Sequence, residues 1–284
     1  MTETLFVINP VSGGENKSDL IDLVRESYPH ADILRTTGKD DDKKISERLQ
    51  VNSYQRVVAA GGDGTIALVA NRMHFSNIPL GIIPVGSANG LANELSIPMV
   101  LQDALEKAMT GGGKPFDIIE INKQWHVLHM ADFGMNATLV RRYQNDDHRG
   151  FLGYAISGLK ELPNLVSSNA FEMDIQNTTH QLESNFVIIA NARRYGTGIE
   201  VNPNGRVDDG KFEICYLQNI SFERFLRQIM DNQTFELSPF GIHSVEEARF
   251  HLKEPMDFQV DGEYMGTVDR LQAEILSGAV RLVY

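Results

Sequence analysis

Residues 57–71 read VVAAGGDGTIALVAN, and they decide how the first half of the chain is interpreted. Four apolar residues run into a glycine-rich turn, GGDGT, and a segment with helical periodicity follows. A turn between a strand and a helix presents backbone N–H groups beside the positive end of the helix dipole, which favours an anion such as phosphate. The question is why such a turn carries a carboxylate, Asp63, at its centre.

A divalent cation would explain Asp63. A carboxylate beside bare phosphate is repelled, and in a partly buried site the repulsion is costly. Mg²⁺ makes the arrangement favourable, because it binds one or two carboxylates together with phosphate oxygens. The turn therefore predicts ATP with Mg²⁺ and phosphoryl transfer, with a turn that binds no ligand as the alternative. A dinucleotide site fits less well, since Ser87 and Asn89 stand where an acidic residue is expected.

The segments around this turn alternate between strands and helices. Strands are expected at residues 4–9, 31–36, 56–60 and 80–85, with helical patterns between them. This alternation predicts right-handed crossovers and a mostly parallel sheet. We therefore expect an α/β domain over residues 1–114, ending at the glycine-rich segment TGGGKP.

Beyond residue 115 the pattern becomes mostly that of strands. WHVLHMADF at 125–133, KFEICYL at 211–217 and MDFQV at 256–260 are examples, and Asp-Gly pairs between such segments are typical of turns. One helical pattern interrupts them, GFLGYAISGLKELPNL at 150–165. A mostly antiparallel β domain over residues 115–272 is expected.

Composition excludes several classes of protein. The chain has 284 residues, of which 42% are apolar and 23% charged, which is typical of a globular protein. Its formal net charge of -12 argues against nucleic acid as a partner and against broad adhesion to anionic membranes. Cys215 is the single cysteine, so no internal disulfide forms, and a cytoplasmic location is expected.

Two further turns belong to the same pattern. PVGSANGLANE at 84–94 places Gly86, Ser87 and Asn89 after a strand, and VINPVSGG places Asn9 after the first strand. Ser87 as a simple helix cap is the alternative explanation of the former. Because ligands of open α/β sheets bind at the carboxyl ends of the strands, these turns are expected to form one crevice.

A fourth motif, FQVDGEYMG at 258–266, lies in the second part of the chain. An Asp-Gly pair between strand-like segments is most simply a hairpin turn. That turn is compatible with catalysis, in which Asp261 is a general base and Glu263 a carboxylate on the metal side. The eight histidines show no metal-binding spacing, so zinc is not expected.

These motifs, in this order, resemble the diacylglycerol kinase catalytic-domain superfamily, which includes sphingosine and ceramide kinases and bacterial lipid kinases. The matching segments are VINPVSGG, GGDGT, PVGSANGLA, YGTGIEVNPNGRVDDGKFEI and VDGE. The resemblance implies a phosphofructokinase-like ATP-binding domain and a C-terminal β-sandwich that carries the lipid. It also implies that residues 273–284 return to the first domain.

The resemblance also implies roles for individual residues. The residues implied to hold ATP are Asn9, Gly61, Gly62, Gly64, Thr65, Gly86, Ser87 and Asn89. Asp63 would lie near Mg²⁺ and the phosphates, Asp261 would be the general base, and Glu263 would be its acidic neighbour. Asp209 matches a loop that holds a structural Mg²⁺ in some bacterial members.

Two positions depart from the family pattern. Arg206 stands where an aspartate often supports the structural Mg²⁺, and Gly90 stands where bacterial diacylglycerol kinases have a carboxylate. Ser87 and Ala88 look more like the sphingosine and ceramide kinase branch. The expected activity is ATP- and Mg²⁺-dependent phosphorylation of a diacylglycerol- or sphingoid-like lipid.

Two alternatives to a lipid kinase are open, an NAD kinase and a non-catalytic module that binds nucleotide or lipid. A lipid substrate implies transient contact with a membrane surface, so we expect a cytoplasmic protein peripheral to the membrane. The apolar pattern at 150–165, with Phe133 and Met135, is a candidate lining for the lipid tails, and ordinary core packing is its alternative. The sequence does not fix the oligomeric state and leaves a homodimer open.

Overall fold

The computed structural model describes residues 3–14, 17–143, 169–195, 199–217 and 240–284. The helical pattern predicted at 150–165 lies outside the described residues. The chain divides into two compact units, unit 1 comprising Met1–Asp117 with Ser277–Tyr284, and unit 2 comprising Ile118–Leu276.

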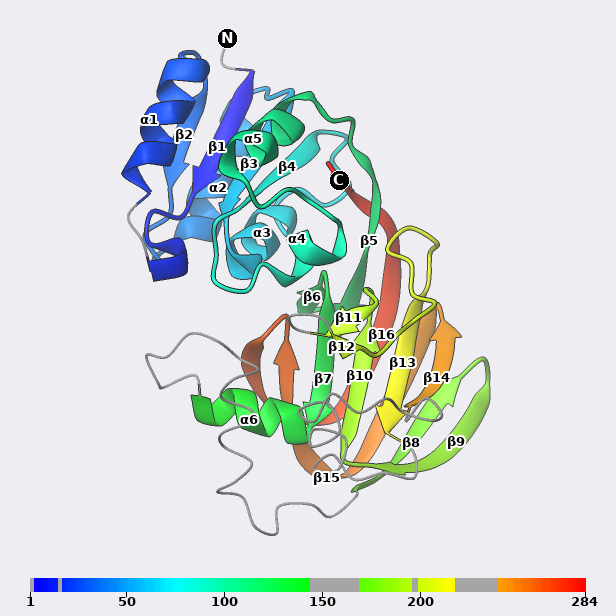
Figure 1. Cartoon of the computed structure of the whole chain (residues 1–284). Helices are drawn as coiled ribbons and strands as arrows, with labels where there is room; N and C mark the ends of the chain where they lie inside the picture. The colour runs from blue at the N-terminus through cyan, green and yellow to red at the C-terminus, as the bar shows by residue number, and fades with distance from the viewer. Residues whose placement is uncertain (1–2, 15–16, 144–168, 196–198, 218–239) are drawn as a thin grey trace. The chain divides into compact units, whose positions relative to one another are not determined.

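Unit 1 is an α/β domain whose strands and helices alternate along the chain (Figure 1). Its strands are β1 (Thr4–Ile8), β2 (Asp32–Arg35), β3 (Arg56–Gly61) and β4 (Pro79–Pro84). Its helices are α1 (Ser18–Ser27), α2 (Asp41–Val51), α3 (Asp63–Ala70), α4 (Gly90–Glu94) and α5 (Leu101–Thr110), with a 3₁₀ turn at Ser12–Gly14.

The sheet of unit 1 is parallel, with the order β2-β1-β3-β4, and the end of β16 (Glu263–Leu282) pairs beside β4. Leu282 of β16 is the register partner of Leu80. Helices α1 and α5 bury their apolar faces against Phe6, Ile8 and Val58. The chain continues from β1 to its neighbour β2 on one side and from β3 to its neighbour β4 on the other side. The switch point of the topology therefore lies between β1 and β3.

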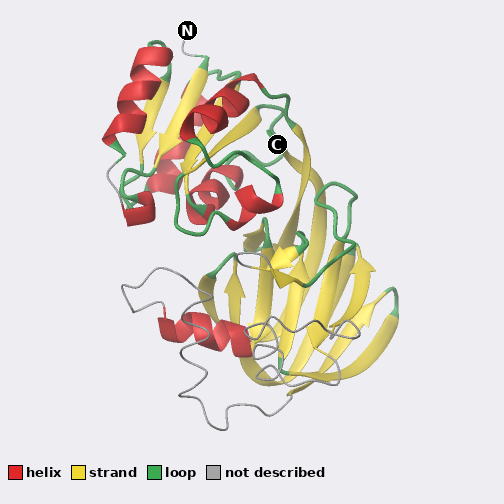
Figure 2. Cartoon of the chain, viewed as in Figure 1, coloured by secondary structure: helices red, strands yellow, loops and turns green. Residues whose placement is uncertain are grey.

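Unit 2 is mostly antiparallel β structure (Figure 2). Strand β5 (Lys114–Ile121) runs from unit 1 into it, and α6 (Met135–Tyr143) is its one described helix. Its other strands are β6 (Trp125–Val127), β7 (Met130–Gly134), β8 (Asn169–Ile175), β9 (Thr178–Ser184), β10 (Phe186–Ala190), β11 (Arg194–Tyr195), β12 (Ile199–Glu200), β13 (Phe212–Leu217), β14 (Phe240–Val245), β15 (Glu247–Val260) and β16. The predicted fold class, an α/β domain followed by a mostly antiparallel β domain, is confirmed.

The long strand β15 organises unit 2. Its first half pairs with β8 and its last residues pair with β7, while β16 runs along both parts. Phe133, Phe171 and Phe250 form the centre of the core, with ring centroids 5.4–6.4 Å apart. Phe133 is therefore a core residue, which agrees with ordinary core packing, the alternative to a lining for the lipid tails.

One predicted strand is wrong. WHVLHMADF forms two strands, β6 and β7, because Leu128 and His129 turn the chain between them. The amides of these two residues are bound by the carboxylate of Asp261. The apolar pattern of the segment gives no sign of this break, since the cause lies on a distant hairpin.

Candidate active site

Three glycine turns meet at the carboxyl edge of the sheet in unit 1. A methyl group added to Gly86 would lie 2.4 Å from the Cα atom of Gly62, and one added to Gly13 would lie 2.8 Å from the carbonyl oxygen of Val85. Such distances leave no room for a side chain. The turns after β1, β3 and β4 are thus packed backbone against backbone, at the edge where ligands of this topology bind.

The turn after β3 is tied to the turn after β1. The amide of Asn9 donates to the backbone oxygen of Ala60 (2.9 Å), and the Asn9 side chain donates from Nδ2 to Thr65 Oγ1 (3.3 Å). Thr65 leaves no space for a Cβ atom on Gly61, which would lie 2.4 Å from it. Gly64 is exposed in the first turn of α3. The first turn of α3 therefore contains an exposed glycine, at a helix end where N–H groups favour an anion.

Asp63 has a partner that the sequence did not suggest. Its Oδ2 atom accepts from the amide of Gly90 (2.9 Å) and its Oδ1 atom from the amide of Leu91 (3.0 Å). These are the first two residues of α4, whose N-terminus carries a partial positive charge. Asp63 therefore caps the neighbouring helix and joins the turn after β3 to the turn after β4.

Asn89 closes the turn after β4 on itself. It adopts a left-handed conformation (φ 50°), its Oδ1 atom accepts from the amide of Gly86 (2.8 Å), and its Nδ2 atom donates to the Gly86 carbonyl (2.9 Å). Ser87 is exposed and precedes the first helical residue by three positions. The alternative in which Ser87 caps the helix is wrong, because the first two amides of α4 donate to Asp63 instead.

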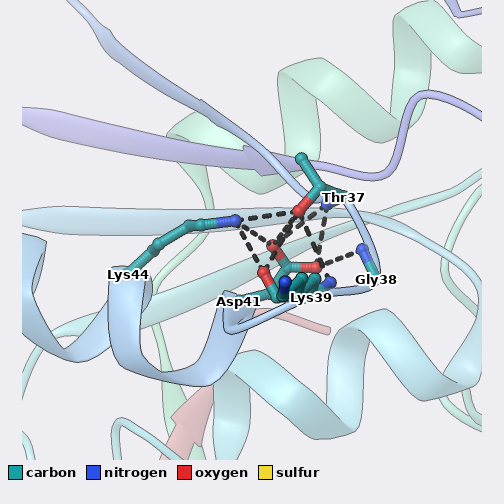
Figure 3. Close-up of polar contacts among 5 residues, drawn as sticks. All are labelled: Thr37, Gly38, Lys39, Asp41 and Lys44. Atoms are coloured by element: carbon teal, nitrogen blue, oxygen red, sulfur yellow. Dashed lines mark hydrogen bonds and ion pairs between the residues drawn. The ribbon is translucent and has the colours of Figure 1, made fainter.

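A fourth turn lies at the same edge, after β2, and no sequence motif predicted it (Figure 3). The buried carboxylate of Asp41 accepts from the amides of Thr37 (2.8 Å) and Gly38 (2.6 Å), and Lys44 Nζ lies 3.1 Å from it. Burial of this carboxylate disfavours its charge, but the hydrogen bonds from Thr37, Lys44 and Gly38 outweigh that effect and hold the pKa of Asp41 below its ordinary value. The sequence signal is a run of three aspartates at positions 40–42, at the start of α2.

In unit 2, Asp261 and Gly262 form the hairpin turn between β15 and β16. Both have positive φ (47° and 88°), as a type I′ turn requires. The Asp261 carboxylate accepts three consecutive amides, from Leu128 to Oδ2 (3.0 Å) and from His129 (2.9 Å) and Met130 (3.0 Å) to Oδ1. The predicted hairpin is confirmed, and the carboxylate points back over the β6–β7 turn.

The environment of Asp261 suits a base. Burial of the carboxylate raises its pKa, and this effect exceeds the opposing effects of the three amides and of His129. A higher pKa makes the carboxylate a stronger proton acceptor. Oδ2 accepts one of the three amides and Oδ1 accepts two, so Oδ2 has the greater capacity left to accept a proton.

Two predicted acidic residues of unit 2 are exposed. Glu263 begins β16 directly after the turn, and Asp209 accepts from the amide of Lys211 (3.1 Å). Arg206 donates from Nε (3.2 Å) and Nη2 (3.1 Å) to Asp208, the neighbour of Asp209. A guanidinium thus already supplies positive charge to this loop. The metal role of Asp209 stays a prediction.

Three further observations concern the rest of the described chain. Cys215 is fully buried, as expected for a small apolar residue, and burial raises the pKa of its thiol. Within the described residues, no three histidine, cysteine or acidic side chains gather as a metal site would require. In the same part of the chain, every helix is too short or too polar to span a membrane.

Comparison with known proteins identifies the family of each part of the chain. Residues 3–121 match the model of a diacylglycerol kinase catalytic domain, and residues 130–284 match the YegS C-terminal NAD kinase beta sandwich-like domain. Lipid kinase YegS of Escherichia coli K12 is 28% identical over 271 residues, which cover 93% of this chain and 89% of that protein. A Klebsiella pneumoniae protein named "Probable lipid kinase YegS-like" is 29% identical over 288 residues, covering 98% and 94%.

A crystal structure of a diacylglycerol kinase from Bacillus anthracis has the same fold. It matches with a TM-score of 0.75 over 99% of this chain and 96% of that chain, at 18% identity. The predicted family and the prediction of a kinase are confirmed. The C-terminal match covers more than half of the chain, and the chain therefore belongs to the family of YegS-like lipid kinases, in which a diacylglycerol kinase catalytic domain precedes the YegS C-terminal domain.

Proposed function

We propose that this kinase transfers the γ-phosphoryl group of ATP, in the presence of Mg²⁺, to a hydroxyl group of a diacylglycerol- or sphingoid-like lipid. The observation that supports it most is the Asp261 carboxylate, which is held by three amides and has a raised pKa. In unit 1, the packed turns around Gly62 and Gly86 would hold the phosphates with backbone N–H groups.

The reaction needs one proton acceptor. Asp261 takes the proton of the lipid hydroxyl on Oδ2 as the alcohol oxygen forms a bond to the γ-phosphorus. The bond from that phosphorus to the β,γ-bridging oxygen breaks, and ADP leaves with the electron pair. General-base assistance of this kind typically contributes about 10²- to 10⁴-fold in rate.

Asp63 is the residue that fits a role beside Mg²⁺. Each of its carboxylate oxygens accepts one amide, and a carboxylate oxygen has capacity for a second contact. A magnesium ion on ATP takes one or two carboxylates and would offset the charge of the phosphates. The same carboxylate would then cap α4 and face the ion or one of its waters, which explains a carboxylate inside a phosphate cradle.

The test is ADP release from Mg-ATP with mixed micelles that contain diacylglycerol, monoacylglycerol, phosphatidylglycerol, sphingosine or ceramide, with NAD in a separate reaction. We expect lipid-dependent ADP release that Asp261→Asn reduces by at least about 10²-fold. Thermal unfolding of the variant controls for the fold, because an asparagine amide would face one of the three N–H donors. An Asp261→Asn protein that keeps near-full activity would exclude the base assignment, and turnover of NAD alone would select an NAD kinase.

Asp63→Asn separates the cap from the metal role in the same assay. If Asp63 holds Mg²⁺, the variant needs a higher Mg²⁺ concentration for half-maximal rate at fixed ATP. If Asp63 is only a cap, the variant loses about 0.5–2 kcal/mol of stability and its Mg²⁺ dependence is unchanged. This second result would remove the metal role and leave the lipid kinase proposal intact.

A further inference from the structure

A series of hydrogen bonds between buried polar side chains begins at the Asp261–Gly262 turn. Gln259 is 1% exposed, and its Oε1 atom accepts from the amide of Gly262 (2.7 Å). Its Nε2 atom donates to Oδ2 of Asp132, which is fully buried and also accepts from Asn136 Nδ2 (2.7 Å). This series of hydrogen bonds thus connects the hairpin turn, through β15 and β7, to α6.

These polar side chains lie on one face of the sheet. Gln259 and Asp132 are register partners on β15 and β7, and their neighbours Phe258 and Phe133 belong to the core on the other face. Because side chains alternate along a strand, Gln259 and Asp132 point away from that core. Burying an amide and a carboxylate is costly unless their hydrogen bonds are specific, so the arrangement calls for a role beyond filling space.

We propose that Gln259, oriented by Asp132, is a positioning residue that holds the Asp261–Gly262 peptide in the orientation needed for catalysis. The inference rests on the proposed function, since it assigns Asp261 as the base. Gln259 accepts from the turn and donates to Asp132, so the role assigned to it acts through Asp261.

The geometry of the turn explains why one hydrogen bond matters. The Asp261–Gly262 peptide is the central peptide of a type I′ turn, and its N–H group donates to Gln259. Asp261 itself disfavours the type II′ alternative, because that turn has glycine at its first central position. The bond to Gln259 Oε1 instead restrains the backbone N–H group directly after Asp261, while the amides of Leu128, His129 and Met130 hold the carboxylate. Gln259 therefore restrains the backbone from which the Asp261 side chain projects.

A second buried carboxylate provides a matched control. Asp257 accepts from Thr138 Oγ1 (2.7 Å), Arg141 Nη1 (2.8 Å) and the Tyr264 hydroxyl (2.8 Å). These bonds also tie α6 to the β15–β16 hairpin, but none of them reaches the turn. Thr138→Val removes one such bond and should cost stability without moving Asp261.

The first experiment compares Gln259→Met with Thr138→Val in the full chain. We expect Gln259→Met to lower kcat for the lipid about 10- to 100-fold, as misplacement of a catalytic group does, with KM for ATP unchanged. Thr138→Val should keep kcat within about twofold at a similar loss of Tm. Equal losses of kcat in the two variants would overturn the proposal, because the effect would then follow stability alone.

A reciprocal exchange tests the hydrogen bonds themselves. Gln259→Glu alone sets two carboxylates against each other, and Asp132→Asn alone sets an amide donor against the Gln259 donor. The double variant restores a donor–acceptor pair with one negative charge, and the carboxylate introduced at position 259 can again accept from the Gly262 amide. We expect kcat to recover in the double variant relative to both single variants. A double variant no better than the worse single variant would contradict the assignment.

Amide hydrogen exchange keeps this test independent of activity. In Gln259→Met, the amides of Gly262, Leu128 and Met130 should exchange faster than in the wild-type protein, and in Thr138→Val they should not. Unchanged exchange would overturn the positioning role whatever the substrate. Faster exchange in a protein without lipid-dependent ADP release would instead support the positioning role and remove the proposed function.

Discussion

Asp41 links the stability of unit 1 to pH. Because the pKa of its carboxylate is held below the ordinary value, its contribution is fully present above the unfolded-state pKa of about 3.9. That contribution is lost as the pH falls toward and through the folded-state pKa. The free energy of unfolding of the wild-type protein should therefore fall more steeply below about pH 5 than that of Asp41→Asn.

The measurement is urea unfolding of both proteins between about pH 3 and pH 7, and the difference between them isolates this one carboxylate. At neutral pH we expect Asp41→Asn to be less stable by roughly 1.5–3 kcal/mol, because the amides of Thr37 and Gly38 lose hydrogen bonds to a charged group. Curves that run parallel over the whole range would show that the Asp41 charge contributes nothing to folding.

At the scale of residues, the sequence singles out the candidate site residues but not the groups that hold them. Asp63 could be singled out because a carboxylate in a phosphate cradle is unusual. Its amide partners, Gly90 and Leu91, come 27 and 28 positions later and meet it only after the turns have packed together. Asp261 is the same case, since its partners precede it by about 130 positions. Residue types can be read from a motif, whereas partners brought together by the fold cannot.

At the scale of elements, the site depends on close packing between turns. Gly86→Ala would place a methyl group 2.4 Å from the Gly62 Cα atom, which is backbone and cannot move without separating the turns after β3 and β4. We expect a loss of roughly 1–3 kcal/mol of stability from overpacking. ATP affinity should fall at least about tenfold, since the cradle loses its shape. Calorimetric titration with ATP measures the affinity.

Gly112→Ala is the control for that substitution. A Cβ atom on Gly112 meets nothing within 4 Å, and the residue lies outside the positive-φ region. Its stability and ATP affinity should match those of the wild-type protein. Equal affinity of Gly86→Ala and Gly112→Ala would show that the contact between the two turns does not shape the proposed ATP site.

The order of elements in unit 1 could be predicted because a glycine-containing turn follows each strand and apolar residues recur at helical spacing in the segments between the strands. Strands β6 and β7 could not be separated by the same means. Residues 125–133 contain no glycine or proline, and the break at Leu128 and His129 is imposed by Asp261. Local pattern decides an element only where no distant group competes for its backbone.

At the scale of the whole molecule, strands β5 and β16 each contribute to both units, and β16 is the longer of the two. Residues 263–276 of β16 belong to unit 2, and its last residues pair with β4 in unit 1. Two buried leucines of β16 lie in different units. Leu271 (2% exposed) pairs with Phe250 in unit 2, and Leu282 (0% exposed) pairs with Leu80 in unit 1. Truncating either side chain leaves a cavity that typically costs about 2–5 kcal/mol.

The two substitutions should therefore separate the stabilities of the units. Trp125, the single tryptophan, lies in unit 2 with its ring centroid 5.2 Å from that of Phe258, so its fluorescence follows unit 2. Under the proposed function ATP binds at the glycine turns, so loss of ATP binding reports on unit 1. In urea, Leu282→Ala should lower the midpoint for loss of ATP binding more than the midpoint for Trp125, and Leu271→Ala should do the reverse. If both midpoints move together in both variants, the units unfold as one cooperative body, and β5 and β16 are the strands that run through both of them.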